Sequence, residues 1–247
     1  MKTKIAIAGA GWLGKPLAIF LRNLGHQVSV ISRDCRHIEW TQNMNIALLV
    51  TDYSNTFSAV VSANSDVLII CIPPVENYTD KIDFLVRQTE AKKIIFCSST
   101  SVYKQEYGLV DEESEVDGNP SLIAAEALLE SYKIPCFILR LGGLIGLTRH
   151  PSRSFAGKLQ LPNGKAPVNL IHQEDVIEII GLLILKSDCG IFNLVNPAHP
   201  MRKSYYENSC SKQGLAPCQF DNQGTGKIVR GDKIACFLSR PYAYSIY

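Results

Sequence analysis

Three glycines near the amino terminus have the spacing of a phosphate-binding turn. They lie in "IAIAGAGWLGKPLA" as Gly9-x-Gly11-x-x-Gly14, between an apolar run and a helical pattern. The first glycine allows a tight turn, the second lets the backbone approach a pyrophosphate, and the third lets the helix pack against the strand. The N–H groups that begin the helix then face the negative charge. The sequence therefore predicts a dinucleotide site formed by Gly9, Gly11, Trp12, Leu13 and Gly14, with a glycine turn that binds nothing as the alternative.

The end of the next apolar run, "VSVISRD", bears on which dinucleotide binds. Ser32 stands about 20 residues past the glycines, where an acidic residue would bond the ribose 2′-hydroxyl of NAD. A carboxylate there would repel a 2′-phosphate, whereas the hydroxyl of Ser32 and the guanidinium of Arg33 can bond it. The pattern favours NADP(H) over NAD(H). Two alternatives stay open: Asp34 would supply an acid after a shift of one residue, and Arg33 could be a solvated surface charge.

Two later segments add candidate cofactor contacts. In "VTDYSN", Asp52 could accept a hydrogen bond from the adenine amino group, with Tyr53 beside it, although an aspartate after a strand is also a common helix cap. In "ICIPPVENY", we expect Ile72, Pro73 and Pro74 to form a loop under the cofactor. The two prolines could equally form a rigid turn without any contact to it.

Short apolar runs alternate with helical patterns along the chain. We expect strands at 4–8, 27–31, 46–50, 67–72, 93–97, 136–139 and 191–194, and helices at 13–24, 77–89, 122–131 and 173–186. Strands that are apolar throughout are typical of a parallel sheet covered on both faces. The sequence thus predicts an α/β fold with a doubly wound parallel (Rossmann) sheet of about seven strands and a small C-terminal substrate lobe.

Ligands of such sheets bind beyond the carboxyl ends of the strands, so sequence inserted there would build the lobe. We expect a dinucleotide-binding domain at residues 1–142, completed by about 168–196. The lobe would then comprise residues 143–167 and 197–247.

Composition narrows the function classes. The 247 residues are 46% apolar with a net charge of +2, too weak a charge to favour nucleic acid or a membrane surface. The eight cysteines form no C-x-x-C pair and no cluster with histidine at zinc spacing, which indicates reduced thiols and no metal site. No signal peptide or membrane-spanning run is apparent, so we expect a cytoplasmic protein.

Four further motifs resemble one known family. They are "SSTSVY", "FILRLGGLIG", "NLIHQEDVIEII" and "GIFNLVNP". Together they resemble the extended short-chain dehydrogenase/reductases, the NAD(P)-dependent epimerase/dehydratase group, over residues 4 to 197. The resemblance implies a nicotinamide cofactor and a small-molecule substrate with a carbonyl or hydroxyl group. It also places Ser98 beside the cofactor and gives Ser99 the role of bonding the substrate oxygen.

The family's proton-transfer pair is missing. In the family a tyrosine on the next helix exchanges the proton, and a lysine four residues later lowers the pKa of that tyrosine. No Tyr-x-x-x-Lys occurs in this sequence. When Glu126 is aligned with the family's acidic residue, Gly118 falls at the tyrosine position and Leu122 at the lysine position. The chain therefore resembles an atypical member of the family.

Nearby residues could take over the missing role. Tyr103 follows Ser99 closely and is our second catalytic candidate, with simple packing as the alternative. Lys104 or Tyr107 could also enter the vacant space.

Two loops carry further candidates. Arg149 and His150, in "TRHPSRS", could bind an anionic substrate or form a solvated loop. His172 could anchor a loop, with Asp175 capping the helix that follows.

Two hypotheses about function follow. The first is an NADP(H)-dependent, epimerase-like oxidoreductase with a nonstandard proton donor, because loss of a general acid costs roughly 10²–10⁴-fold in rate without abolishing it. The second is a noncatalytic NADP(H)-binding redox sensor or partner-binding module. The expected partner is a small-molecule substrate, with no nucleic acid and no membrane, and a homodimer stays open.

Overall fold

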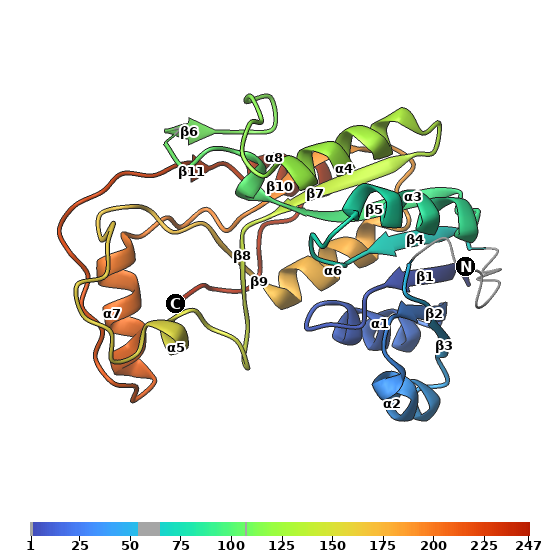
Figure 1. Ribbon diagram of the computed structural model, residues 1–247, viewed down its shortest axis with the longest axis horizontal. Coiled ribbons are helices and arrows are strands. Elements are labelled where there is room, and N and C mark those ends of the chain that lie inside the picture. The colour runs from blue at the N-terminus through green and yellow to red at the C-terminus, as the bar shows by residue number, and fades with distance from the viewer. Residues whose placement is uncertain (1, 54–64, 107) are drawn as a thin grey trace. The chain divides into compact units, whose positions relative to one another are not determined.

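The computed structural model describes residues 2–53, 65–106 and 108–247, which fold as two compact units (Figure 1). The first unit comprises residues 1–98, 120–139 and 177–191, and the second comprises 99–119, 140–176 and 192–247. Each unit is thus built from three separate stretches of chain. The domain boundaries expected from the sequence stay a prediction.

A seven-stranded sheet has the strand order β10-β7-β5-β4-β1-β2-β3. The pairs that join β3, β2, β1, β4 and β5 are parallel. This order, which runs outward in both directions from β1, confirms the doubly wound Rossmann sheet expected from the sequence. The strands are β1 (Lys4–Ala8), β2 (Gln27–Ser32), β3 (Ala47–Val50), β4 (Val67–Ile70), β5 (Lys93–Ser99), β7 (Cys136–Leu141) and β10 (Gly190–Leu194).

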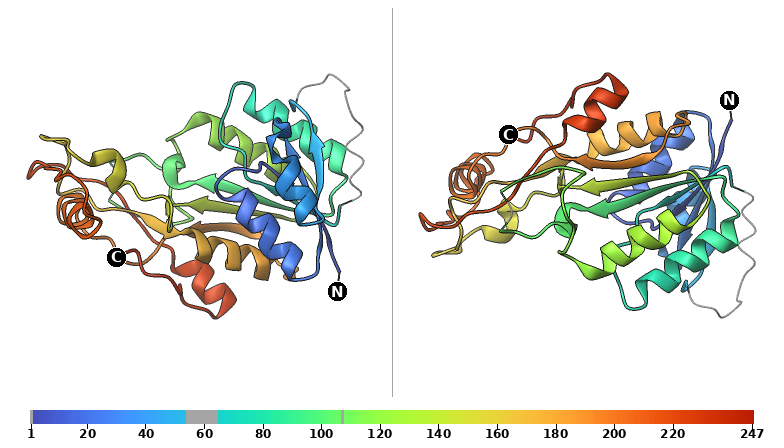
Figure 2. Two further views of the ribbon diagram at one scale, coloured as in Figure 1. Left: turned by 90° about the horizontal axis from the view of Figure 1, so that it is seen from below. Right: turned by 90° about the horizontal axis from the view of Figure 1, so that it is seen from above.

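Helices cover both faces of this sheet (Figure 2). On one face lie α3 (Tyr78–Thr89) and α4 (Pro120–Ser131), and on the other lie α1 (Gly14–Asn23) and α6 (Gln173–Leu183). These four helices match the four expected from the sequence to within a few residues. The first unit also contains the short helices η1 (Cys35–His37) and α2 (Ile38–Asn43), which the sequence did not predict.

The apolar strands explain why the sheet is covered twice. All four residues of β4 are buried, and so are four of the five in β1. Such strands need apolar partners on both faces, which the helices supply. Helix α6 approaches α1 closely because residue 181 is a glycine, where an added Cβ would lie 2.9 Å from the Phe20 ring.

The second unit is built from short elements. Two parallel pairs of strands occur here, β6 (Leu109–Val110) with β11 (Ile228–Val229) and β8 (Gly143–Ile145) with β9 (Leu170–His172). Elements of two or three residues give no readable periodicity, so the sequence did not predict them. The helical segments of this unit are η2 (Thr100–Val102), α5 (Ser152–Phe155), α7 (Arg202–Lys212) and α8 (Asp232–Leu238).

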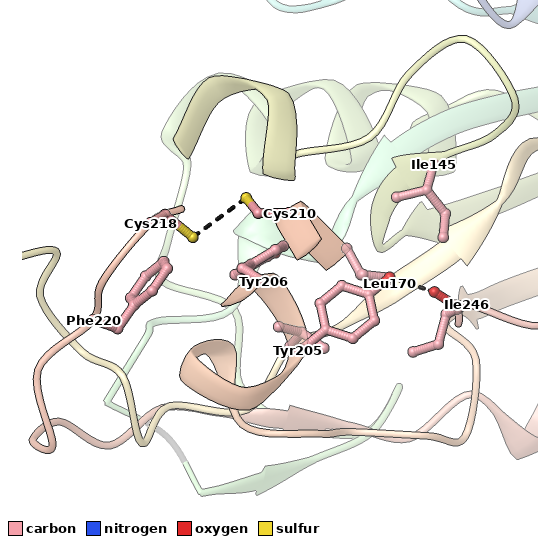
Figure 3. Close-up of a cluster of buried hydrophobic side chains, with 9 residues drawn as sticks. Ile145, Leu170, Tyr205, Tyr206, Cys210, Cys218, Phe220 and Ile246 are labelled. Atoms are coloured by element: carbon pink, nitrogen blue, oxygen red, sulfur yellow. Dashed lines mark hydrogen bonds between the residues drawn. The ribbon is translucent and has the colours of Figure 1, made fainter. Parts of the chain in front are cut away.

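The second unit has its own apolar core, centred on α7 (Figure 3). The Tyr205 hydroxyl donates to the Ile246 carbonyl, and the thiols of Cys210 and Cys218 lie 3.4 Å apart. Asp175, expected to cap α6, lies in its first turn, and its carboxylate accepts the N–H groups of Ala243 and Tyr244. The segment near the C-terminus is therefore tied to the second unit, and Ile246 belongs to its core. Its buried residues are Ile145, Val168, Leu170, Tyr205, Tyr206, Cys210, Cys218, Phe220 and Ile246.

Candidate functional site

The glycine turn joins β1 to α1 with the geometry its spacing predicts. Gly9 has a φ of +99°, a left-handed value that side chains rarely adopt, and its N–H donates to the Ile31 carbonyl at 2.8 Å. A Cβ added to Gly14 would lie 1.9 Å from the Gly9 carbonyl oxygen. A Cβ added to Gly11 would meet nothing within 4 Å. Two glycines thus serve the close packing of the turn, and the third keeps space open in front of it.

That open space belongs to a cavity of about 410 Å³ in the first unit. It begins at the glycine turn and extends to the residues that follow β2 and β4, which is where a doubly wound sheet binds dinucleotides. Seven residues expected to bind the cofactor line it. The lining is Gly9, Ala10, Gly11, Ser32, Arg33, Asp34, Arg36, His37, Tyr53, Cys71, Ile72, Pro73 and Val75.

The segment after β2 carries most of the charge in this cavity. The Asp34 carboxylate accepts the Arg36 N–H at 2.8 Å and pairs with the Arg36 guanidinium, and these two contacts hold the pKa of Asp34 below its usual range. The Ser32 hydroxyl accepts the Asp34 N–H at 3.2 Å, so its own proton stays available to a ligand. Among the described residues, Arg33 forms no ion pair, and its side chain is exposed. This end of the cavity can therefore bind an anion.

Tyr53 closes one wall of the cavity. Its hydroxyl donates to the Ile31 carbonyl at 3.0 Å, and burial raises its pKa to about 12. Asp52 is exposed and is not among the described residues that line the cavity. Four other expected cofactor contacts, Trp12, Leu13, Gly14 and Pro74, are also not part of that lining.

Ser98, the remaining expected cofactor contact, is buried at the end of β5. Its hydroxyl donates to the carboxylate of Glu126 on α4. This bond fixes β5 to the helix that covers it, which is a packing role.

A second cavity, of about 350 Å³, lies within the second unit. It contains two cationic side chains, and no Asp or Glu is among the described residues that form its wall. It includes Ser99, the expected ligand of the substrate oxygen. The lining is Ser99, Thr100, Ser101, Gln105, Gly143, Pro151, Pro167, Val168, Asn169, Leu170, Arg202, Tyr206 and Lys227.

Ser99 is fixed at the start of the helical turn η2. Its hydroxyl oxygen accepts the Ser101 N–H at 3.1 Å, which leaves the hydroxyl proton free to donate. A backbone hydrogen bond also fixes this turn, because the Gly118 N–H donates to the Val102 carbonyl at 2.7 Å. This fixed hydroxyl in a cavity wall fits the role that the family resemblance gives to Ser99.

The position of the missing tyrosine has no room for a side chain. A Cβ added to Gly118 would lie 2.2 Å from the Ser101 carbonyl oxygen and 2.8 Å from Val102. Contacts that short do not occur, so this backbone accepts only glycine. Leu122, at the position of the missing lysine, is a buried core residue.

Tyr103 serves a packing network. It is 1% exposed, its hydroxyl donates to Asn193 Oδ1 at 2.9 Å, and it accepts from Arg140 at 2.8 Å. Burial raises its pKa, and it is not among the described residues that line the second cavity. The structure thus supports packing, the alternative kept open for Tyr103. Of the two catalytic candidates, Ser99 is the one among the described residues that line the second cavity.

The second cavity also contains cations that the sequence did not single out. Lys227 Nζ donates to the carbonyls of Thr100 and Tyr103, and burial lowers its pKa. The Arg202 guanidinium lies over the rings of Phe155 and Phe220, at 5.8 and 5.4 Å. No spacing in the sequence connects either residue with Ser99, so no local signal could have found them.

Comparisons with known proteins agree with this geometry. The family model that describes the NAD binding domain of 6-phosphogluconate dehydrogenase matches residues 4–118. Protein YeeZ of Escherichia coli (strain K12) is 38% identical over 269 residues, which covers 98% of this chain and 96% of that protein. The chain belongs to the YeeZ family.

Solved structures share the fold of this YeeZ-family protein. A functionally unknown conserved protein from Silicibacter pomeroyi has a TM-score of 0.82 at 18% identity, with 98% of this chain and 94% of that chain covered. UDP-glucuronic acid 4-epimerase from Bacillus cereus, in complex with NAD, has a TM-score of 0.77 at 18% identity, with 100% and 94% covered. The fold is that of the extended short-chain dehydrogenase/reductases, as the sequence motifs predicted.

The YeeZ-family chain uses its expected substrate residues differently. His150 accepts the Ser152 N–H at Nδ1, at 3.2 Å, and its Nε2 lies 2.9 Å from the Tyr205 hydroxyl. Both ring nitrogens are therefore used inside the core of the second unit. Arg149 is exposed, and neither residue is among the described residues that line the second cavity.

The remaining candidates also have structural contacts. Lys104 pairs with Asp117. The ring of His172 stacks on Tyr244 with centroids 4.9 Å apart, consistent with an anchoring role. Tyr107 lies outside the described residues.

Two general features complete the site. Within residues 2–53, 65–106 and 108–247, no cluster of three or more His, Cys, Asp or Glu side chains is arranged to hold a metal ion. In the same ranges, no helix has the length and apolarity needed to cross a membrane.

Proposed function

We propose that this protein is an NADP(H)-dependent oxidoreductase or epimerase that acts on a small anionic compound with a carbonyl or hydroxyl group. The observation that carries this proposal is the first cavity, which combines the glycine turn with the cationic segment after β2. The second cavity, with Ser99 and two cations in its wall, supports the substrate part of the proposal.

The contacts of Asp34 support NADP(H) over NAD(H). Its carboxylate is engaged by Arg36, whereas Arg33 forms no ion pair among the described residues and the Ser32 hydroxyl can still donate. A 2′-phosphate would therefore meet a guanidinium and a hydroxyl. Hydrogen bonds between charged groups of this kind are about twice as strong as neutral ones.

The residues present fit a dinucleotide. The open direction at Gly11 admits a pyrophosphate to the N–H groups at the start of α1, and Ile72 and Pro73 would lie along the cofactor. NADP(H) would supply or accept the hydride. The protein's own part is to bind, to orient and to exchange a proton.

The second cavity supports an anionic substrate. Arg202 and Lys227 contribute positive charge, and its volume of about 350 Å³ suits a small ligand. Arg202 thereby takes the role first given to Arg149 and His150. The fold relative from Bacillus cereus is named for UDP-glucuronic acid, a charged sugar nucleotide, which is compatible with this class.

A fluorescence titration tests the cofactor proposal. We expect NADPH to bind at least 10-fold more tightly than NADH, because one charge-assisted contact is worth roughly 1.4 kcal/mol. Equal affinities, or a preference for NADH, would show that Asp34 rather than Arg33 determines the choice. Binding of neither would contradict the proposed function.

A noncatalytic NADP(H) sensor is the second candidate, and the closed backbone at Gly118 favours it. Turnover separates the two candidates. We expect slow NADPH oxidation with carboxylate-bearing ketones or aldehydes, reduced at least 10-fold in Ser99→Ala. The sensor hypothesis instead predicts binding without turnover of any compound and no effect of Ser99→Ala.

A further inference from the structure

Lys227 is held at the second cavity by its backbone as well as its side chain. Asn169 Nδ2 donates to the Lys227 carbonyl at 2.9 Å, and Asn169 Oδ1 accepts the Val229 N–H at 2.9 Å. Lys227 is only 7% exposed. Its amine is therefore fixed in the cavity wall, unlike the mobile amine of a surface lysine.

Two of the three N–H groups of this ammonium are used. Nζ donates to the Thr100 carbonyl at 2.7 Å and to the Tyr103 carbonyl at 2.5 Å. Among the described residues, the third N–H has no partner, and Lys227 is one of the residues that line the cavity. A neutral amine also has two N–H groups, so the same two carbonyls hold either protonation state. The remaining position carries a proton in the ammonium and a lone pair in the amine.

Ser99 is attached to the same short turn. It directly precedes Thr100 and lines the same cavity. The turn therefore fixes a hydroxyl donor and a titratable amine in one wall. A substrate oxygen that accepts from Ser99 would lie in the cavity that Lys227 also faces.

We propose that Lys227 is the proton donor and acceptor for the substrate oxygen that Ser99 binds, in place of the absent Tyr-x-x-x-Lys pair. This inference rests on the proposed function. In reduction, the Lys227 ammonium would transfer one proton to the carbonyl oxygen, and NADPH, when bound, would supply the hydride to the carbonyl carbon and become NADP⁺. The carbonyl π bond breaks, O–H and C–H bonds form, and the amine regains its proton from water. In oxidation, the lone pair of the amine would take the hydroxyl proton and later release it to water, and bound NADP⁺ would accept the hydride from the same carbon.

The surroundings of Lys227 suit a group that changes protonation. Burial lowers the pKa of Lys227, so the neutral amine forms at a pH closer to the physiological value. The titratable groups that face it are Tyr103, with a ring centroid 6.0 Å from Nζ, Glu106, whose charge raises the pKa of Lys227, and Arg202 in the cavity wall. No carboxylate pairs with Lys227 among the described residues.

Lys93 offers a matched control in the other unit. Its Nζ also donates to two backbone carbonyls, those of Ile184 and Lys186, and burial also lowers its pKa. Lys93 is not among the described residues that line either cavity. A lysine that only ties the backbone together should behave like Lys93.

Turnover is the first part of the test. NADPH oxidation is followed with pyruvate and levulinate from pH 5.5 to 9.5 for the wild type, Lys227→Met, Lys227→Arg and Lys93→Met. We expect both Lys227 variants to lose roughly 10²–10⁴-fold in rate, because methionine and arginine cannot exchange a proton at these pH values. Lys93→Met should stay within threefold of the wild type. A Lys227→Arg protein as active as the wild type would overturn the inference.

The second part measures the protonation of Lys227 directly, without following turnover. Protein labelled with ¹³C-lysine is titrated from pH 5 to 11, and the ¹³Cε resonance of Lys227 is assigned by its absence in Lys227→Arg. We expect its midpoint to lie below those of exposed lysines and to coincide with a limb of the pH–rate profile. A midpoint equal to that of exposed lysines would overturn the role of Lys227. Absence of any NADPH oxidation by the wild type would instead count against the proposed function.

Discussion

The two cavities of this protein are built in different ways. The first is assembled from residues at or soon after the ends of β1, β2, β3 and β4, and its central feature is a backbone shape set by glycines. The second brings together residues that lie far apart in the sequence, and Thr100 and Lys227 are 127 positions apart. A backbone turn can be read from a local pattern, whereas a side-chain constellation depends on the fold of the whole unit. The residues of the proposed cofactor site can therefore be predicted from local sequence patterns, whereas those of the proposed proton-transfer site cannot.

The same contrast explains why the missing pair cannot be restored by substitution. The double substitution Gly118→Tyr with Leu122→Lys would create the Tyr-x-x-x-Lys pattern of the family. A Cβ at residue 118, however, would clash with the Ser101 carbonyl oxygen. We expect a loss of about 3 kcal/mol or more in the free energy of unfolding, measured in urea, because a rigid backbone blocks the new side chain. Gly108→Ala is the control, since a Cβ at residue 108 meets nothing within 4 Å. A double variant that is as stable as the wild type and oxidises NADPH faster would show that residue 118 does have room for a tyrosine.

The glycine turn itself separates packing from binding. We expect Gly14→Ala to lower the free energy of unfolding by about 1–3 kcal/mol, because its Cβ would overlap the Gly9 carbonyl. Gly11→Ala should unfold like the wild type but bind NADPH at least 10-fold more weakly, because its Cβ enters the open cavity. Urea unfolding and fluorescence titration measure the two effects. If both variants lost the same stability, Gly11 would serve packing as Gly14 does, and would not keep space open for a ligand.

Particular residues show how far the sequence could lead. The four long helices and seven strands were predictable because short, fully apolar runs alternate with helical patterns. Gly9, Ser32 and Arg33 were predictable because each lies at or directly after the end of a strand. His150 was expected to bind substrate because its neighbours in the sequence do not reveal that its ring lies within hydrogen-bond distance of the Tyr205 hydroxyl. Lys227 was missed because its contacts with Thr100 and Tyr103 depend on the β6–β11 pairing, which is too short to predict.

The smallest effect that we predict concerns His150 in the core of the second unit. Burial lowers its pKa, so the unfolded state takes up the proton first as the pH falls below about 6.5. Stability should therefore be lost as the pH falls from 6.5 through the lower folded pKa, by less than about 1 kcal/mol after solvent screening. Urea midpoints at pH 7.5 and 5.5 should differ more in the wild type than in His150→Asn. The same difference in both proteins would show that His150 does not titrate with folding.

The separation of binding from proton transfer is the central claim, and NADPH affinity measured in two variants tests it most directly. Arg33→Ala changes the first cavity and Lys227→Met changes the second. We predict that Arg33→Ala weakens NADPH binding about 10-fold and leaves NADH binding unchanged, because only NADPH carries the 2′-phosphate. Lys227→Met should bind both cofactors as the wild type does. A Lys227→Met protein that loses as much NADPH affinity as Arg33→Ala would contradict the account.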